Sequence, residues 1–591
     1  MYDTDHARQN FIIFEFVFFI LYFFTVRLRA CDLCLIQKKP HLFEPSIVCP
    51  PPFYLSIVIG SAEGLVKRSV SIHKEPSSTM DSLSSNQDQD LSPIVIKGYK
   101  YFNAETKENM LIKGIDYYPR PNFGRLNINN VDFFTEKYRH IWERDIPHFQ
   151  ALGANAIRLY SVDPNNDHSA FMCALNAAGI YVLVELASGN CPHCAISELE
   201  APYCYPKYLK IRGEKIIREF SKYSNTLAFS AGNEVNHFVP MGSKPQWNAP
   251  CLKKFVRDMR AYTAQCVSSS SMRHVPVGLI MADSDRDENT LYYNCQNGDD
   301  DLEPAEWYGI NTYVYCNANF TNFDESGGFK LLAESFESYN YSIPVLLTEF
   351  GCLSKSFPTV DGYQGQRSFH QAEWLGLPGI QNEFAGGFAF EYSIESENAR
   401  TPFPFKEFGQ QNYGVGYFYP ENCNDVTIMC EYNRTPSFYN LKIAFNNAKA
   451  ENLTIDEFVP DEGRTNRTQC PPHFPPLSNF KWAVDRHRSA QCPKESDVAF
   501  TCPRPQTNGA VGVDQGATPL VSFLVLAGLV IITISLGKFL SGLPSKRTRS
   551  ALFGELWKYG QLKDTDIEVT TEESRVFKLP KHEYSSASNS L

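Results

Sequence analysis

The sequence lacks several features that define large classes of function. Basic residues are not in excess: 55 Lys and Arg stand against 66 Asp and Glu, so the net charge of −11 provides no footprint for nucleic acid. No glycine-rich phosphate loop, Ser-His-Asp order or strong metal motif is present. The Cys191-Pro-His-Cys194 pair has no second CxxC at zinc-site spacing, which favours a disulfide over a metal. We therefore expect no nucleic-acid partner, no cofactor and no metal.

Cysteine, in contrast, is abundant. The chain has 17 cysteines, and fourteen of them lie between Cys173 and Cys502. An even number of this size fits a disulfide framework formed in an oxidising compartment. Five N-glycosylation sequons in the same part of the chain agree with the secretory pathway. Their asparagines are Asn319, Asn340, Asn433, Asn452 and Asn466.

One apolar run is long enough to cross a membrane. Residues 517–537 contain no charged side chain, and about 20 apolar residues span a hydrocarbon core of ~30 Å as a helix. Lysine and arginine follow directly, which places the polar tail, residues 538–591, in the cytoplasm. Because a polar tail follows the run, a GPI anchor is not expected. We expect a type I single-pass protein with its folded region extracellular or lumenal, at the plasma membrane or cell surface.

The regions that flank the folded part are expected to be a targeting signal, a linker and a stalk. Residues 1–30 contain a short apolar stretch that fits either a signal peptide or a signal anchor, and a cleavable signal is favoured. Residues 31–93 end in a Ser/Asp/Gln-rich stretch and are expected to be a linker. Residues 451–516 contain Cys and Pro, and we expect a stalk with one or two disulfides.

Residues 94–450 alternate short apolar runs with helical patterns. Eight such runs predict eight strands, and eight strands alternating with helices over roughly 300 residues favour a (β/α)8 TIM barrel of the α/β class. An open doubly wound sheet is the alternative, but no GxGxxG follows the first strand. The predicted strands are 110–115, 154–160, 180–186, 226–232, 275–281, 307–311, 344–348 and 387–392.

Two carboxylates follow strands of this predicted barrel. Glu234 ends the fourth strand region and Glu349 ends the seventh, at the face where barrel enzymes carry their active sites. Cleavage of a glycosidic bond requires one carboxyl group that donates a proton and one that attacks the anomeric carbon, about 5–5.5 Å apart in retaining enzymes. Asn233 can hydrogen-bond a sugar 2-hydroxyl, and Tyr313 can orient the nucleophile. Either residue could instead serve only to pack or to satisfy strand ends.

With these residues in place, the chain resembles the β-1,3-glucanosyltransferases of glycoside hydrolase family 72, which elongate cell-wall β-1,3-glucan. The resemblance covers about residues 94–416 and consists of short motifs in a fixed order. Among them are Ile157-Arg-Leu-Tyr-Ser-Val-Asp-Pro164, Ala231-Gly-Asn-Glu-Val235, Gly309-Ile-Asn-Thr-Tyr313, Thr348-Glu-Phe-Gly-Cys352 and Asn412-Tyr-Gly414.

The resemblance implies roles for individual residues. Glu234 corresponds to the acid/base and Glu349 to the nucleophile, in a reaction that cuts β-1,3-glucan internally and transfers the glucosyl-enzyme fragment to an acceptor glucan. The substrate-binding residues expected are Tyr117, from the rim after the first strand, and Tyr160, Asn233, Tyr313 and Tyr392. The resemblance also implies a disulfide between Cys316 and Cys352, and a second that joins Cys295 to Cys423 or Cys430.

The chain departs from the family pattern on several loops. Tyr118 stands where the family often has Gln, and an insertion rich in Pro, Phe and Arg lies between Tyr392 and Asn412. These loops would bind sugar, so cleavage is expected to be intact while the choice of acceptor is open. Two rival functions are a β-1,3-glucan hydrolase on the same barrel and a non-catalytic glucan-binding membrane receptor. The presence of both carboxylates counts against the receptor.

Overall fold

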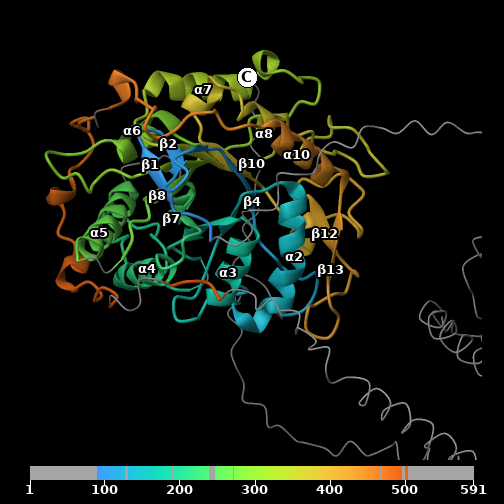
Figure 1. Ribbon diagram of the computed structural model, residues 1–591, viewed down its shortest axis with the longest axis horizontal. Helices are drawn as coiled ribbons and strands as arrows, with labels where there is room; N and C mark the ends of the chain where they lie inside the picture. Colours follow the sequence, from blue (N-terminus) through green and yellow to red (C-terminus); the bar gives the residue numbers. More distant parts are fainter. Residues whose placement is uncertain are drawn as a thin grey trace, which may run out of the picture. The chain divides into compact units, whose positions relative to one another are not determined.

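The computed structural model describes residues 90–126, 131–189, 191–238, 247–269, 272–465, 468–494 and 500–503. Its central element is a closed barrel of eight strands, each hydrogen-bonded to the next in chain order (Figure 1). All neighbouring strands are parallel. The strands are β4 (Ile112–Asp116), β5 (Ala156–Leu159), β6 (Tyr181–Glu185), β7 (Thr226–Asn233), β8 (Val277–Ala282), β9 (Tyr308–Asn311), β10 (Val345–Phe350) and β11 (Gly386–Ala389).

The predicted (β/α)8 barrel is confirmed, and its strands are buried on both faces. Every residue of β6 and β10 is buried, because helices cover the outside of the barrel and side chains fill the inside. This two-sided burial produces continuous apolar runs in the sequence. Since all eight strands run in the same direction, their C-terminal ends meet at one face and bring the residues that follow them together.

The helices surround the barrel (Figure 1). In α4, Leu209, Ile216, Ile217 and Phe220 are buried at the spacing of one helical face. The helix α2 ends at Gly153, whose φ of 79° lets its N–H reach the carbonyl groups of the last turn. The α-helices are α2 (Arg139–Leu152), α3 (Ser169–Ala177), α4 (Lys207–Phe220), α5 (Ala249–Ser268), α6 (Arg286–Asn294), α7 (Gly328–Tyr339), α8 (His370–Trp374), α9 (Ser396–Ala399) and α10 (Pro436–Asn447).

Smaller elements complete the domain. An antiparallel sheet of β1 (Ile94–Lys97), β2 (Lys100–Asn103) and β3 (Asn109–Met110) precedes the barrel. Its residues Ile94 and Tyr101 are buried in the same cluster as Leu183 and Leu346 of the barrel strands. A hairpin of β12 (Gly416–Tyr419) and β13 (Glu431–Arg434) follows β11. Short 3-10 helices are η2 (Glu136–Tyr138), η3 (Val235–Phe238), η4 (Phe323–Glu325), η5 (Ile380–Asn382), η6 (Glu462–Arg464), η7 (Leu477–Asn479) and η8 (Ala483–Arg486).

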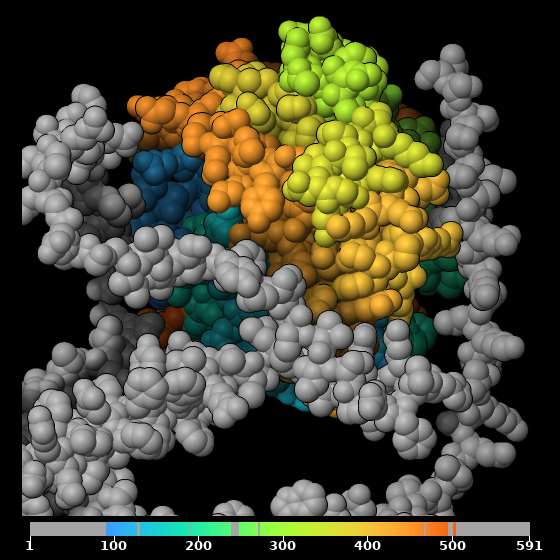
Figure 2. Space-filling model, turned by 90° about the vertical axis from the view of Figure 1, so that its right-hand side faces the viewer, coloured from blue at the N-terminus to red at the C-terminus, as the bar shows by residue number. Residues whose placement is uncertain are grey.

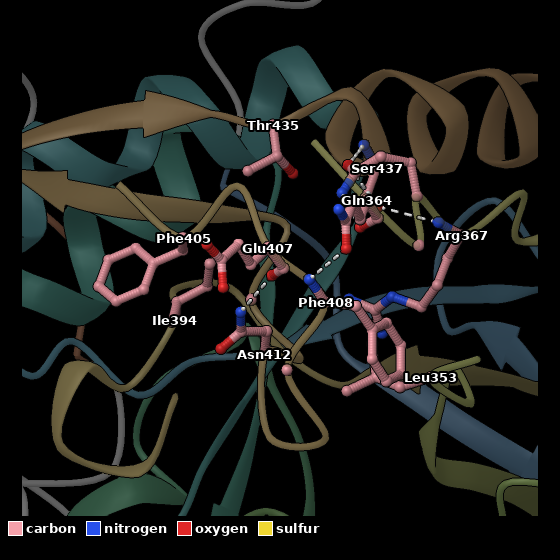
Figure 3. A pocket seen from close by; sticks show the side chains of 14 residues that line it. Leu353, Gln364, Arg367, Ile394, Phe405, Glu407, Phe408, Asn412, Thr435 and Ser437 are labelled. Carbon is pink, nitrogen blue, oxygen red and sulfur yellow. Dashed lines mark hydrogen bonds between the residues drawn. The ribbon is translucent and has the colours of Figure 1, made fainter. Parts of the chain in front are cut away.

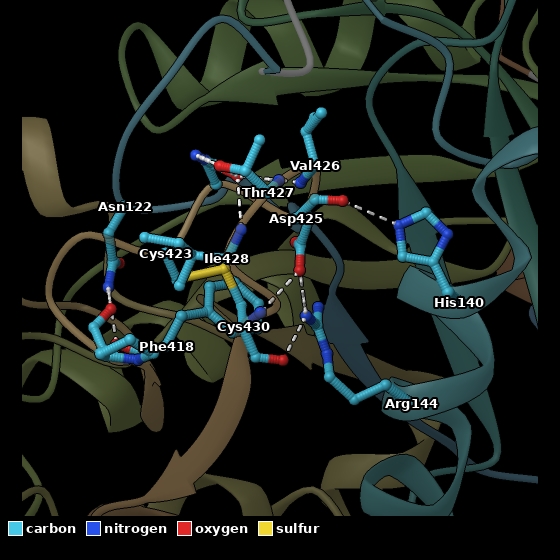
Figure 4. Close-up of a disulfide and its surroundings, with 12 residues drawn as sticks. Asn122, His140, Arg144, Phe418, Cys423, Asp425, Val426, Thr427, Ile428 and Cys430 are labelled. Atoms are coloured by element: carbon cyan, nitrogen blue, oxygen red, sulfur yellow. Dashed lines mark hydrogen bonds and ion pairs between the residues drawn. A yellow bond between two sulfur atoms is a disulfide. The ribbon is translucent and has the colours of Figure 1, made fainter. Parts of the chain in front are cut away.

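The disulfides differ in part from the prediction. Cys316 is bonded to Cys352, as the resemblance implied. Cys295, however, is bonded to Cys470, and Cys423 is bonded to Cys430 within one short loop (Figure 4). The predicted pairing of Cys295 with Cys423 or Cys430 is therefore wrong. The loop closed by Cys423–Cys430 is fixed independently, because Asp425 pairs with Arg144 over 3.2 Å.

The segment after residue 450 is bonded to the barrel domain and does not form its own disulfides. Besides Cys295–Cys470, the structure contains Cys266–Cys492 and Cys173–Cys502. The prediction of one or two disulfides within this segment is therefore wrong, because each of its cysteines has a partner on the barrel side. Buried Phe474 and Trp482 also pack into the main core.

Several further predictions concern surface and membrane features. Asn319, Asn340 and Asn452 are exposed and Asn433 is half-buried, whereas Asn466 lies outside the described residues. Within the described ranges, no helix has the length and apolar character needed to span a bilayer. The predicted spanning segment, 517–537, and the tail, 538–591, lie outside the described residues, as do residues 1–89.

Candidate active site

Two carboxylates lie at the C-terminal face of the barrel, where β7 and β10 end. Glu349 belongs to β10 and is 7% exposed, and Glu234 follows β7 directly. Glu234 has a φ of 51°, in the left-handed region that non-glycine residues seldom adopt. Such strain persists only where the surrounding structure enforces it, and it is concentrated at functional sites. The backbone therefore holds the Glu234 side chain in a defined position.

Three donors surround the carboxylate of Glu349. Tyr160 donates its hydroxyl to Oε1 over 2.9 Å, and Arg158 Nη1 donates to the same oxygen over 3.0 Å. Tyr313 donates to the other oxygen, Oε2, over 2.9 Å. Three donors on two oxygens fix the orientation of the carboxylate. An oriented carboxylate is what a nucleophile requires.

Glu234 has a different environment. Burial, and then the negative charge of Glu349, raise the pKa of Glu234 above its usual value. Its oxygen Oε1 accepts one hydrogen bond, from Asn311 Nδ2 over 3.0 Å. A raised pKa keeps more of this group protonated, which a proton donor requires. The two carboxylates therefore differ in the way that separate acid and nucleophile roles demand.

Asn233 is bonded to one residue that contacts Glu349 and to one that contacts Glu234. Its Oδ1 accepts from Arg158 Nη2 over 2.8 Å and from Asn311 Nδ2 over 3.0 Å. Asn311 is itself held by Thr348, whose hydroxyl donates to Asn311 Oδ1 over 2.8 Å. Because the internal contacts of Asn233 use its oxygen, its amide nitrogen is the atom that can donate to a sugar hydroxyl.

Further acids surround Arg158 beneath this site. Arg158 is fully buried, lies 3.4 Å from Asp116 and lies 3.8 Å from Glu185. Burial raises the pKa of Glu185 to about 7 and raises that of Asp116 well above its usual value. Asp116, Asn311 and Glu185 were assigned no role from the sequence. Their position at strand ends is the signal that could have identified them.

Two predicted substrate-binding tyrosines are not at this site. Tyr117 and Tyr392 are fully buried, and both donate their hydroxyls to Asp145 of α2, over 2.8 Å and 2.9 Å. Their rings pack against each other with centroids 5.5 Å apart. A hydroxyl enclosed in this way does not reach a sugar, so the prediction that these two residues bind substrate is wrong. Tyr160 and Tyr313, in contrast, are half-buried and contact Glu349.

Within the described residues, no group of three or more His, Cys, Asp or Glu side chains could hold a metal ion. The site instead consists of carboxylates, amides, tyrosines and one buried arginine. This donor set is suited to orienting a polyhydroxyl substrate and to moving protons.

Several known proteins are similar to part of this chain. It is 33% identical over 312 residues to the 1,3-beta-glucanosyltransferase PGA4 of Candida albicans, covering 52% of this chain and 61% of that protein. It is 32% identical over 308 residues to the 1,3-beta-glucanosyltransferase GAS5 of Saccharomyces cerevisiae, covering 52% and 57%. The chain thus spans about three fifths of the length of these relatives. The structure of Saccharomyces cerevisiae Gas2p in complex with laminaripentaose is 28% identical, with a TM-score of 0.48 and coverage of 64% of this chain and 74% of that one.

A family model described as "Glucanosyltransferase" matches residues 83–400, which is more than half of the chain. This match contains both carboxylates and the residues that hold them. The chain therefore belongs to glycoside hydrolase family 72, the glucanosyltransferase family.

Proposed function

We propose that the protein is a retaining 1,3-β-glucanosyltransferase. The observation that carries this proposal is the difference between the two carboxylates: three donors hold Glu349, while burial and the neighbouring charge raise the pKa of Glu234. The relatives named above are 1,3-beta-glucanosyltransferases, which supports β-1,3-glucan as donor and acceptor.

The proposed reaction has two displacements. Glu349 attacks the anomeric carbon of an internal glucosyl unit while Glu234 donates its proton to the departing glycosidic oxygen. A covalent glucosyl ester forms on Glu349, and Glu234 becomes a carboxylate. Glu234 then removes the proton from an acceptor hydroxyl, which attacks the same carbon and releases Glu349. The acceptor gains the fragment, and both carboxyl groups return to their starting states.

Hydrolysis would follow the same first displacement, with water as the second attacker. The two reactions differ only in whether an acceptor glucan excludes water from the ester. A non-catalytic glucan receptor would not require an acid with a raised pKa beside a carboxylate that three donors orient. Transfer is favoured over hydrolysis because the relatives named above are glucanosyltransferases.

We also propose that the enzyme acts at the cell surface as a type I membrane protein. Seven disulfides among the described residues support an oxidising compartment for the barrel. The apolar run 517–537, followed by basic residues, supports a single membrane anchor. Exposed asparagines at three sequons support glycosylation at those positions.

Product analysis with reduced β-1,3-glucan oligosaccharides tests the activity on the purified full-length protein. Glu234→Gln and Glu349→Gln remove the proposed acid and nucleophile, and Glu431→Gln, on an exposed position of β13, is the control. Products longer than the substrate, lost in both site variants and retained in the control, establish the transferase. Only shorter products would identify a hydrolase, and binding without any product would favour the receptor.

A further inference from the structure

The segment 395–412, which lies within the predicted insertion, is a packed part of the rim at the catalytic face. It begins with α9, and its rings Phe403 and Phe405 pack on Tyr417 of β12 with centroids 5.7 Å and 5.8 Å away. Backbone hydrogen bonding joins it to the loop after β10, where Gln364 N–H donates to the Lys406 carbonyl over 2.8 Å. Figure 3 shows this junction, and Figure 2 shows the yellow-green and gold surfaces of the two segments side by side. The family match ends at residue 400, inside this segment.

The first turn of the segment reaches a buried arginine on another loop. Glu395 and Glu397 lie 3.5 Å and 3.6 Å from Arg120 Nη1, on the loop after β4. Arg120 is 9% exposed, and its Nε has no hydrogen-bond partner in the described part of the chain. A buried donor without a protein partner is uncommon in native proteins, and ordered water usually completes it.

Arg120 in turn holds Tyr118. The guanidinium group lies 5.2 Å from the Tyr118 ring centroid, and Nη2 donates to the Tyr118 hydroxyl over 3.3 Å. A cation over an aromatic face fixes the plane of the ring. Glu395 and Glu397 pair with Nη1 of the same guanidinium group, so the inserted segment is connected to Tyr118 through Arg120.

Tyr118 also contacts a residue that holds the proposed nucleophile. Its half-buried ring meets Tyr160 edge to face, with centroids 5.7 Å apart, and Tyr160 donates to Glu349. Contacts therefore continue from the inserted segment through Arg120, Tyr118 and Tyr160 to the nucleophile. The sugar that becomes bonded to Glu349 belongs to the donor, so a ring on this side of the site lies next to donor units.

We propose that Tyr118 contacts a donor glucosyl unit beside the one that reacts, and that Glu395 and Glu397 position it through Arg120. This inference rests on the proposed function. Tyr118 supplies a flat apolar face for a pyranose ring, and Arg120 holds that ring in place. Tyr118 is then a specificity-determining residue, and the two glutamates are positioning residues that decide at which bond the donor is cut and how long the transferred fragment is.

The experiment compares Glu395→Gln/Glu397→Gln with the control Glu407→Gln, which alters an exposed glutamate of the same segment away from Arg120. Each full-length variant is assayed with β-1,3-glucan oligosaccharides labelled at the reducing end, and kcat, KM and the lengths of both fragments are measured. We expect KM for the donor to rise about three- to tenfold with kcat within about twofold, and the preferred cleavage position to shift. The control should match the wild-type protein.

A double-mutant cycle with Tyr118→Ala tests whether the glutamates act through the tyrosine. If they do, adding Glu395→Gln/Glu397→Gln to Tyr118→Ala changes neither KM nor fragment lengths further. Unchanged fragment lengths in the glutamate variant, or fully additive effects in the cycle, would overturn the inference. If the glutamate variant does not fold, the cleavage positions of Tyr118→Ala and Tyr118→Phe are compared. Only Tyr118→Ala, which loses the ring, should shift the cleavage position. A wild-type protein without activity would refute the proposed function itself.

Discussion

Tyr313 donates its hydroxyl to Glu349 Oε2 over 2.9 Å, from the loop that follows β9. The other oxygen of the same carboxylate is held by Tyr160 and Arg158 of the β5 region. Donors from the ends of two separate strands, β5 and β9, thus fix both oxygens of the proposed nucleophile. Because the plane of the carboxylate is set from two sides, loss of either tyrosine hydroxyl should affect the attack on the sugar more than it affects folding.

Replacing Tyr313 with Phe should lower kcat by about ten- to a hundredfold, because a hydrogen bond to a charged group is lost from the nucleophile. Steady-state kinetics on β-1,3-glucan oligosaccharides measures this change. The matched control is Tyr417→Phe, which removes a hydroxyl that is bonded to Tyr363 over 3.1 Å instead of to Glu349. Equal losses in both variants would contradict the assigned role of Tyr313.

Replacing Glu349 with Gln should lower the pKa of Glu234. The charge of Glu349 is one of the causes that raise this pKa, after burial, and a neutral amide removes that repulsion. A carbon-13 NMR titration of labelled glutamate side chains in the variant and the wild-type protein measures the difference. An unchanged or higher pKa in the variant would show that the two carboxylates do not interact.

Replacing Glu185 with Gln should stabilise the protein above neutral pH. Burial raises the pKa of Glu185 to about 7 from an unfolded value near 4.5, so folding takes up a proton between these two pH values. Ionised Glu185 lowers the free energy of unfolding. This loss of stability is absent below about pH 4.5, grows as the pH rises, and levels off at about 3 kcal/mol above pH 7. Urea unfolding of both proteins at pH 4.5 and pH 8 tests this. A difference that does not grow with pH would contradict it.

His168 should show the opposite dependence on pH. Burial alone would lower the pKa of His168, but Asp132, at 2.9 Å, and Glu219, at 3.8 Å, outweigh burial and raise the pKa to about 9. The stabilisation is therefore complete below about pH 6.5 and is lost as the pH rises through about 9. The wild-type protein should have a higher free energy of unfolding than His168→Asn, and this difference should shrink by about 3 kcal/mol between pH 6 and pH 10. Glu219→Gln should reduce this change, and a constant difference would disprove the ionised pair.

Removing the Cys295–Cys470 disulfide with Cys295→Ser/Cys470→Ser should lower the free energy of unfolding by about 2–5 kcal/mol, because this bond closes a long loop. Mass spectrometry of non-reduced peptides should find Cys295 joined to Cys470 and Cys423 joined to Cys430. Peptides that join Cys295 to Cys423 would restore the original prediction.

The sequence by itself determined the barrel and the two carboxylates. Strands enclosed by helices outside and side chains inside are buried on both faces, so they leave continuous apolar runs that can be recognised without a structure. Glu234 and Glu349 were recognisable because each is an acid directly after such a run, where a charge has a function or a partner. These properties depend on local order along the chain.

Only the tertiary structure decided which tyrosines face the site, which cysteines pair and what the inserted segment contacts. Tyr117 and Tyr392 also lie at strand ends, yet their side chains turn toward Asp145, while Tyr160 and Tyr313 turn toward Glu349. Cysteine pairing depends on which distant segments lie side by side, and residues 295 and 470 are 175 positions apart. Side-chain direction and long-range contact arise from packing of the whole domain, so neither is encoded in the spacing of residues along the chain.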